Sequence, residues 1–208
     1  MEQKLIDAMT AVTNPTTTPP PPSGNLPDKK WNGKWLNLET RHHPMLRKLE
    51  TEVGRFCFDM WREPLRGRLM VLSGKNGNGK THCAKAVRRW VDTVGRGRAV
   101  ELAPLSLIFW HWPALLDTLK NGGWDLVEDC FTTPLLVIDE LGGGHDPSGV
   151  GVDKLCQILT RRENKWTLIT TNIAPQAWRT EFDNRVASRF FRNSTLIDLS
   201  DVPDYNAS

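Results

Sequence analysis

A glycine-rich segment has the residue types and spacing of a phosphate-binding loop. It reads GKNGNGKT and matches the pattern G-x-x-x-x-G-K-[ST]. Glycines let backbone N–H groups approach phosphate oxygens closely. Lys80 can reach the β- and γ-phosphates, and the Thr81 hydroxyl can bind Mg²⁺. The pattern predicts an ATP and Mg²⁺ site whose contacts are Gly74, Lys75, Asn76, Gly77, Asn78, Gly79, Lys80, Thr81 and His82.

The alternative interpretation of this segment is a glycine-rich hairpin turn with an unrelated lysine. The flanking sequence argues against it. An apolar run from Leu69 to Leu72 precedes the loop and a helical pattern follows it. A phosphate loop requires this strand–loop–helix order, because the positive end of the helix then faces the anion.

Two adjacent carboxylates end a second apolar run, Leu135 to Ile138. Burying an unpaired carboxylate is costly, so these acids belong at the exit of the strand, where open α/β sheets bind ligands. We expect Asp139 to hold Mg²⁺, through its waters, and Glu140 to act as general base on the attacking water. An ordinary Asp-Glu turn is the alternative.

Three further residues are candidates for reading or stabilising the γ-phosphate. Asn172 follows the apolar strand pattern LITT, where its amide could lie between the catalytic water and the phosphate. Arg185 and Arg189 are four residues apart and therefore share one helix face. A guanidinium can stabilise charge on a transferring phosphoryl group, in the same subunit or from a neighbour. The alternatives are a turn-forming Asn and a pair of solvated arginines.

Strand and helix patterns alternate around these motifs. Five apolar runs predict strands, at residues 68–73, 105–110, 134–139, 166–171 and 195–199. Apolar residues at helical spacing predict helices at 44–61, 81–94, 113–120, 152–163 and 184–191. Alternation of this kind predicts an α/β domain with a parallel sheet.

Composition indicates a globular protein that does not enter a membrane. The 208 residues are 39% hydrophobic and 25% charged, with a net charge of +3, and they contain no long apolar run. The first ten residues do not resemble a signal peptide, so we expect a cytoplasmic protein. Its cysteines, Cys57, Cys83, Cys130 and Cys156, lack the close spacing of zinc or redox motifs and are expected to be buried free thiols.

The amino-terminal region differs from the rest of the chain. Residues 1–13 could form a short helix with one apolar side, and residues 14–30 form a linker rich in proline and threonine. The folded domain is expected to cover residues 31–208. A basic stretch between Trp61 and Arg98 could attract phosphates, although a solvated helix face would look the same.

The ordered motifs GKNGNGKT, LLVIDELG, TLITTN and RVASRFF together resemble those of AAA+ ATPases. The spacing is especially similar to the DnaC-like helicase loaders and the related IstB transposition helpers. The resemblance covers residues 45–205. It departs from many loaders at the amino terminus, where only a short helix and linker precede the core and zinc cysteines are lacking.

The resemblance implies a P-loop NTPase of the AAA+ type. Its fold would be a three-layer sandwich whose five-stranded parallel sheet has the order 5-1-4-3-2, without a separate lid domain. It implies that Asn172 is a nucleotide sensor, that Arg189 is a finger acting on the adjacent subunit and that Arg185 supports that interface. It also implies a homo-oligomer with ATP, single-stranded DNA as a ligand and a replicative helicase as partner.

Three other functions fit parts of this pattern. A transposition helper that binds duplex DNA and a transposase would have a nearly identical folded region. A small-molecule P-loop kinase seldom needs a water-activating glutamate, so Asp139-Glu140 and Asn172 favour hydrolysis. A nucleotide-bound scaffold has no support from the intact motifs. Trp110 and Trp112 could stack a nucleic-acid base, or they could pack under the neighbouring helix.

Overall fold

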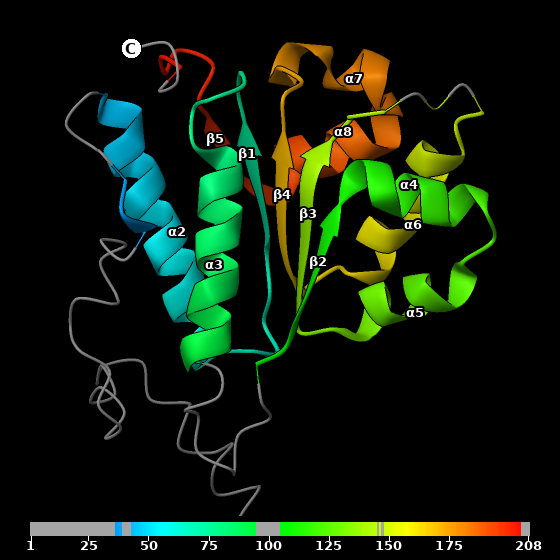
Figure 1. The fold of residues 1–208 in the computed structure, drawn as a ribbon, viewed down its shortest axis with the longest axis horizontal. Coiled ribbons are helices and arrows are strands. Elements are labelled where there is room, and N and C mark those ends of the chain that lie inside the picture. Colours follow the sequence, from blue (N-terminus) through cyan, green and yellow to red (C-terminus); the bar gives the residue numbers. More distant parts are fainter. Residues whose placement is uncertain (1–35, 39–42, 95–104, 145, 147, 205–208) are drawn as a thin grey trace, which may run out of the picture.

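A parallel five-stranded sheet forms the centre of the protein (Figure 1). The computed structural model describes residues 36–38, 43–94, 105–144, 146 and 148–204, so the predicted helix 1–13 and linker 14–30 lie outside the described residues. The strands are β1 (Leu69–Ser73), β2 (Leu107–His111), β3 (Leu135–Leu141), β4 (Trp166–Thr171) and β5 (Ser194–Asp198). They pair in the order β2-β3-β4-β1-β5, which confirms the predicted 5-1-4-3-2 sheet.

Helices cover both faces of the sheet and give the predicted three layers (Figure 1). On one face lie α2 (Pro44–Arg62) and α3 (Lys80–Val94). On the other lie α4 (Trp112–Lys120), α5 (Trp124–Thr132), α6 (Val150–Arg161), the 3₁₀ turn η4 (Pro175–Ala177), α7 (Trp178–Glu181) and α8 (Asp183–Arg192). Among the described residues, no helix is long and apolar enough to cross a membrane.

Alternation along the buried strands divides the core into two clusters. In β3, Leu135 and Val137 pack toward α2 and α3, whereas Leu136 and Ile138 pack toward the helices of the other face. Because both faces are covered, the strand is apolar throughout until it reaches Asp139. Trp112, the first residue of α4, is 4% exposed and packs in the second cluster, so it is not available to stack a base.

Several regions differ from the sequence prediction, among them the 3₁₀ turn η4 and helix α7, which were not predicted. Helix α5 was not predicted, because it is only nine residues long and follows Gly122 and Gly123. Strand β3 continues to Leu141, two residues beyond its predicted end at Asp139, and its pairing with β4 shifts register between Ile138 and Leu141. This irregularity lies at the candidate acids and changes how they are presented.

Buried Arg162 ties together three elements at the amino-terminal ends of β3 and β4. It is the C-cap of α6 and is 3% exposed. Its Nε donates to Thr167 Oγ1 at 2.9 Å, and its Nη1 donates to the carbonyls of Cys130 and Thr133 at 2.6 and 2.9 Å. Burial lowers the pKa of Arg162 to about 10, so the guanidinium remains charged near neutral pH. The four cysteines are buried thiols that form no disulfide, as predicted.

Candidate nucleotide-binding site

The predicted site residues meet at one edge of the sheet, because parallel strands bring their carboxyl ends together. A cavity of about 680 Å³ opens there. It is lined by Asn37, Leu38, Asn76, Gly77, Gly79, Lys80, Thr81, His82, Glu140 and Asn172. The structure therefore gathers the glycine-rich loop, one candidate acid and the candidate sensor around a single space.

The loop between β1 and α3 holds Lys80 folded against its own backbone. The Lys80 ammonium donates to Lys75 O at 2.6 Å and to Asn78 Oδ1 at 2.9 Å. Its burial lowers the pKa of Lys80 to about 8, although the nearby Asp139 and Glu140 oppose this shift. These two acceptors are weak compared with phosphate oxygens. The ammonium therefore lies beside the cavity, where the oxygens of a bound anion could replace these two acceptors.

A chain of hydrogen bonds across three elements joins the two candidate Mg²⁺ ligands, Thr81 and Asp139. Thr81 Oγ1 donates to Asp139 Oδ1 at 3.2 Å, and Thr170 Oγ1 donates to the same oxygen at 2.6 Å. The backbone N–H of Glu140 donates to Thr170 Oγ1 at 2.9 Å. Asp139 is 2% exposed, so these hydroxyls satisfy a buried carboxylate.

Thr170 was missed by sequence analysis, because its role depends on how β3 and β4 pair. Ile138 of β3 lies opposite Ile169 of β4, the register shifts after this pair, and the Thr170 hydroxyl contacts Asp139 Oδ1. Hydroxyl and carboxylate oxygens are the hard ligands that Mg²⁺ prefers. Thr81 and Asp139 come from neighbouring elements and already lie in hydrogen-bond contact, so their chemistry fits the predicted Mg²⁺ site.

Glu140 has an unusual backbone conformation that turns it out of the strand. Its φ is 59°, a left-handed value that is uncommon for a non-glycine residue. Its side chain is 45% exposed and contacts the cavity. Glu140 Oε2 lies 2.8 Å from His111 Nε2, at the end of β2. No sequence motif marked His111 as a site residue, so this pairing was not predicted.

A short segment before α2 closes the other side of the cavity. His82 Nε2 lies 2.6 Å from Leu36 O, which ties this segment to the first turn of α3. Leu36 is completely buried, and the next two residues, Asn37 and Leu38, line the cavity. No sequence motif marks residues 36–38, so their place at the site could not be predicted.

The two candidate arginines of α8 are not among the residues that line this cavity. Arg185 Nη2 pairs with Asp153 at 2.7 Å and with Asp183 at 2.8 Å. Arg189 Nη2 donates to Thr160 Oγ1 of α6 at 2.7 Å, and its Nη1 donates to Arg185 O at 3.1 Å. Both guanidinium groups therefore face α6 within their own chain.

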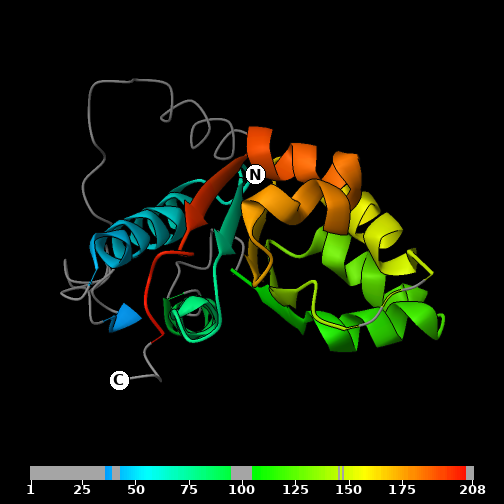
Figure 2. The same cartoon turned by 90° about the horizontal axis from the view of Figure 1, so that it is seen from above.

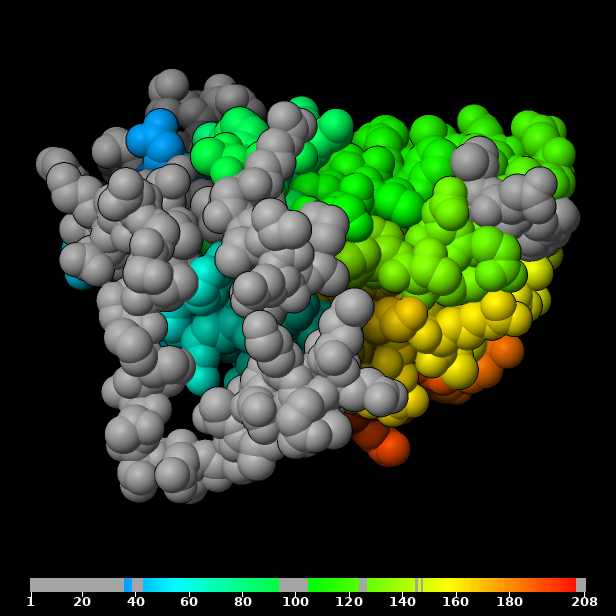
Figure 3. All heavy atoms as spheres, turned by 90° about the horizontal axis from the view of Figure 1, so that it is seen from below, coloured from blue at the N-terminus to red at the C-terminus, as the bar shows by residue number. Residues whose placement is uncertain are grey.

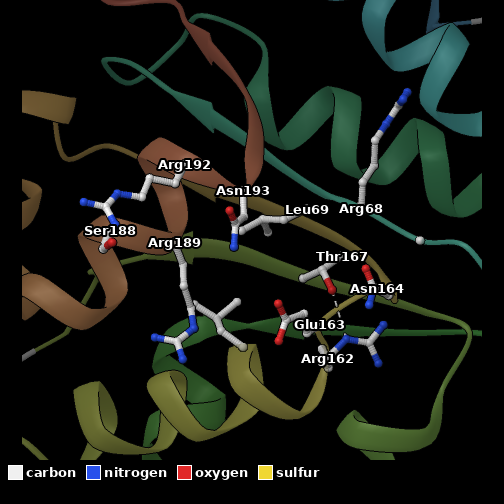
Figure 4. A pocket seen from close by; sticks show the side chains of 12 residues that line it. Arg68, Leu69, Arg162, Glu163, Asn164, Thr167, Ser188, Arg189, Arg192 and Asn193 are labelled. Atoms are coloured by element: carbon white, nitrogen blue, oxygen red, sulfur yellow. Dashed lines mark hydrogen bonds between the residues drawn. The ribbon is translucent and has the colours of Figure 1, made fainter.

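A second cavity, of about 630 Å³, lies near the opposite edge of the sheet, the end seen in Figure 3. It is lined by Gly67, Arg68, Leu69, Leu159, Arg162, Glu163, Asn164, Thr167, Ser188, Arg189, Arg192 and Asn193. Figure 4 shows that the guanidinium groups of Arg68, Arg189 and Arg192 point in different directions. They do not converge on one point, so the cavity lacks the arrangement of an anion site.

Comparison with solved structures relates this fold to replication proteins. The chain is similar to the DnaC helicase loader, with 20% identity and a TM-score of 0.63 over 82% of this chain and 98% of that one. It is similar to DnaI, with 20% identity and a TM-score of 0.59 over 72% and 84% of the two chains. Replication initiator DnaA, solved with AMPPCP and single-stranded DNA, gives 17% identity and a TM-score of 0.58.

These similarities establish the fold. The match covers 84% of this chain but only 50% of the DnaA chain. No family model matches the sequence, and no curated protein matches it. The predicted three-layer α/β fold with a five-stranded parallel sheet in the order 5-1-4-3-2 is confirmed, and it is similar to the folds of the DnaC helicase loader and DnaI.

Proposed function

We propose that this chain is an ATP-hydrolysing helicase loader that acts on single-stranded DNA as a homo-oligomer. One observation carries the proposal: Lys80, Glu140 and Asn172 line a single cavity, and Thr81 of that cavity is bonded to Asp139. A lysine on a glycine loop, a metal-type acid and a second, exposed acid are the groups that ATP hydrolysis requires.

In this proposal the loop amides and the positive end of α3 bind the phosphates, and Lys80 exchanges its loop carbonyl for phosphate oxygens. Thr81 and Asp139 would hold Mg²⁺, which when bound neutralises charge on the phosphates. The Glu140 carboxylate accepts a proton from the attacking water, while His111 Nε2 contacts its Oε2 atom. The Asn172 amide orients that water against the γ-phosphate.

The two arginines act between subunits in this proposal. Arg189 would reach the γ-phosphate bound by a neighbouring copy, and Arg185 would support the interface. Their distance from the cavity in one chain is consistent with this role, because such a finger completes the site only on assembly. Hydrolysis would then depend on protein concentration.

The partner assignment is supported by the sequence motifs and by the fold shared with a helicase loader and with an initiator solved with single-stranded DNA. We propose that residues 1–13 dock on a replicative helicase as an apolar-faced helix, tethered by residues 14–30.

The test compares the full chain with a variant lacking residues 1–28. ATPase activity is measured with and without single-stranded DNA, and helicase binding by pull-down. We expect the deletion to keep ATPase activity and lose the helicase. Equal helicase recovery from both proteins would reject the docking role, and absence of ATPase activity in the full chain would reject the proposed function.

A further inference from the structure

The chain that follows β5 runs directly along the outside of the phosphate loop. Leu199 N donates to Ser73 O at 2.7 Å, at the residue where β1 ends. Leu199 also packs against Gly74, where a Cβ atom would lie 2.9 Å from the Leu199 carbonyl carbon. Figure 2 shows the segment leaving β5 and passing beside the start of α3. Residues 199–204 are therefore part of the surroundings of the loop.

A buried amide links this segment to the phosphate-binding lysine. Asn78 is completely buried. Its Nδ2 donates to Leu199 O at 2.9 Å, and its Oδ1 accepts from Lys80 Nζ at 2.9 Å. When Lys80 turns toward a phosphate, Asn78 Oδ1 loses a charged donor in a buried position. A buried acceptor does not stay unsatisfied without cost, so Asn78 and its contact with Leu199 must readjust.

The end of the segment brings a carboxylate onto the loop itself. A Cβ atom on Gly77 would overlap the carboxyl group of Asp204, so that group lies in direct contact with the glycine backbone. Gly77 has a φ of 76° and lines the nucleotide cavity on its other side. A single glycine therefore separates the Asp204 carboxylate from the space predicted for the phosphates.

The position of Asp204 is fixed by the turn before it. Val202 N donates to Leu199 O at 3.0 Å, which makes a tight turn, and the Val202 side chain is 3% exposed in the core beside α2 and α3. Asp201, in the same turn, and Asp204 are both exposed, and the three atoms nearest to a Cβ on Gly77 all belong to Asp204. Of these two exposed carboxylates, Asp204 is therefore the one in contact with the loop.

We propose that residues 199–204 sense whether the phosphate loop is occupied. The Asp204 carboxylate has the same sign as the triphosphate and opposes its binding across Gly77. Nucleotide binding moves Asp204 away from the loop. The movement of Lys80 toward the phosphates also reaches Leu199, the first residue of the segment, through the hydrogen bonds of Asn78. The inference rests on the proposed function, since it requires a nucleotide at Lys80.

The affinity test uses Asp204→Asn with Asp201→Asn as its matched control, and measures binding of magnesium ATPγS by calorimetry. Removing the carboxylate charge that repels the triphosphate is expected to tighten ATPγS binding on the order of threefold to tenfold in Asp204→Asn, with no change in Asp201→Asn. Wild-type affinity in Asp204→Asn, or equal tightening in both variants, overturns the inference. Failure of the wild-type protein to bind ATPγS overturns the proposed function as well.

A second measurement follows the wild-type chain, with Lys80→Ala as its control. Hydrogen exchange of the backbone amides of Ser200, Asp201, Val202 and Asp204 is expected to increase when magnesium ATPγS is added, because the contact with Gly77 is released. The same nucleotide should leave exchange in Lys80→Ala unchanged. Exchange that stays constant while calorimetry reports bound nucleotide overturns the sensing role and leaves the nucleotide site intact.

Discussion

His111 Nε2 and Glu140 Oε2 lie 2.8 Å apart and join the end of β2 to the irregular end of β3. Glu140 is half-exposed and has a strained backbone, so few other contacts fix its carboxylate. We infer that His111 is a positioning residue for the proposed general base. The pairing also explains why a polar residue ends an otherwise apolar strand.

Replacing His111 by Ala should lower kcat for ATP by about tenfold, because the Glu140 carboxylate loses the partner that orients it. The affinity for ATPγS should not change. His111→Gln keeps a side-chain donor and should recover part of the activity. The measurement is steady-state phosphate release together with calorimetric binding. A loss of nucleotide affinity equal to the loss of kcat would instead indicate a structural role.

Glu140→Gln should retain nucleotide binding and lose hydrolysis. An amide cannot accept the proton of the attacking water, and general-base catalysis is worth about 10²- to 10⁴-fold. Single-turnover phosphate release measures this loss, with calorimetry as the check on binding. Glu163→Gln, an exposed glutamate at the other edge of the sheet, is the matched control and should hydrolyse ATP like the wild type. Equal turnover in Glu140→Gln and wild type would mean that another group activates the water.

Nucleotide affinity should fall as the pH rises above about 8. Burial lowers the pKa of Lys80 to about 8, so the free protein loses the ammonium above that pH. A bound triphosphate favours the charged lysine, and binding must then take up a proton. Calorimetry of ATPγS at pH 7 to 9.5 in buffers of different ionisation enthalpy should report this proton uptake. Affinity that is constant across this range in wild type would show that Lys80 does not bind the phosphates.

Arg189→Ala should reduce ATP hydrolysis by about 10³-fold under conditions where subunits contact each other. In one chain Arg189 bonds to Thr160 and to the Arg185 carbonyl, away from the Lys80 cavity. Specific activity of the wild type should therefore rise with protein concentration, whereas that of Arg189→Ala should stay low throughout. Mixing Arg189→Ala with Lys80→Ala should restore activity at their shared interfaces. Constant wild-type activity on dilution to the monomer would exclude a finger in trans.

Sequence analysis predicted the sheet because each strand has a strong local pattern. The run from Leu135 to Asp139 is apolar until its carboxylate, and the loop from Gly74 to Thr81 carries its own spacing rule. Element ends were harder to predict because they depend on tertiary contacts. The extension of β3 to Leu141 requires the register shift against β4, and no local sequence pattern predicts that shift.

The contacts that complete the candidate site come from elsewhere in the chain. His111 meets Glu140 only because β2 and β3 are neighbours, with His111 opposite Asp139. Asp204 meets Gly77 only because the turn after β5 crosses the phosphate loop. Neither pair has a sequence spacing that could predict it. Sequence motifs therefore identified the groups that carry the chemistry. The topology determined which residues position those groups, as His111 does, or repel the bound triphosphate, as we propose for Asp204.

Arg162→Met should destabilise the fold by about 3 kcal/mol, because several buried carbonyl groups would lose their donor. In the wild type the guanidinium donates to the carbonyls of Cys130, Thr133 and Trp166, which lie at the ends of α5, β3 and β4. Methionine preserves much of the side-chain volume, so the effect isolates the hydrogen bonds. Urea unfolding followed by tryptophan fluorescence measures the loss. Arg161→Met is the control: this neighbour is 60% exposed, pairs with Glu128 and stacks on Phe131 at 4.4 Å. Its loss should cost at most about 1 kcal/mol. Equal unfolding midpoints for the two variants would show that the carbonyls find other donors, and that Arg162 does not hold these elements together.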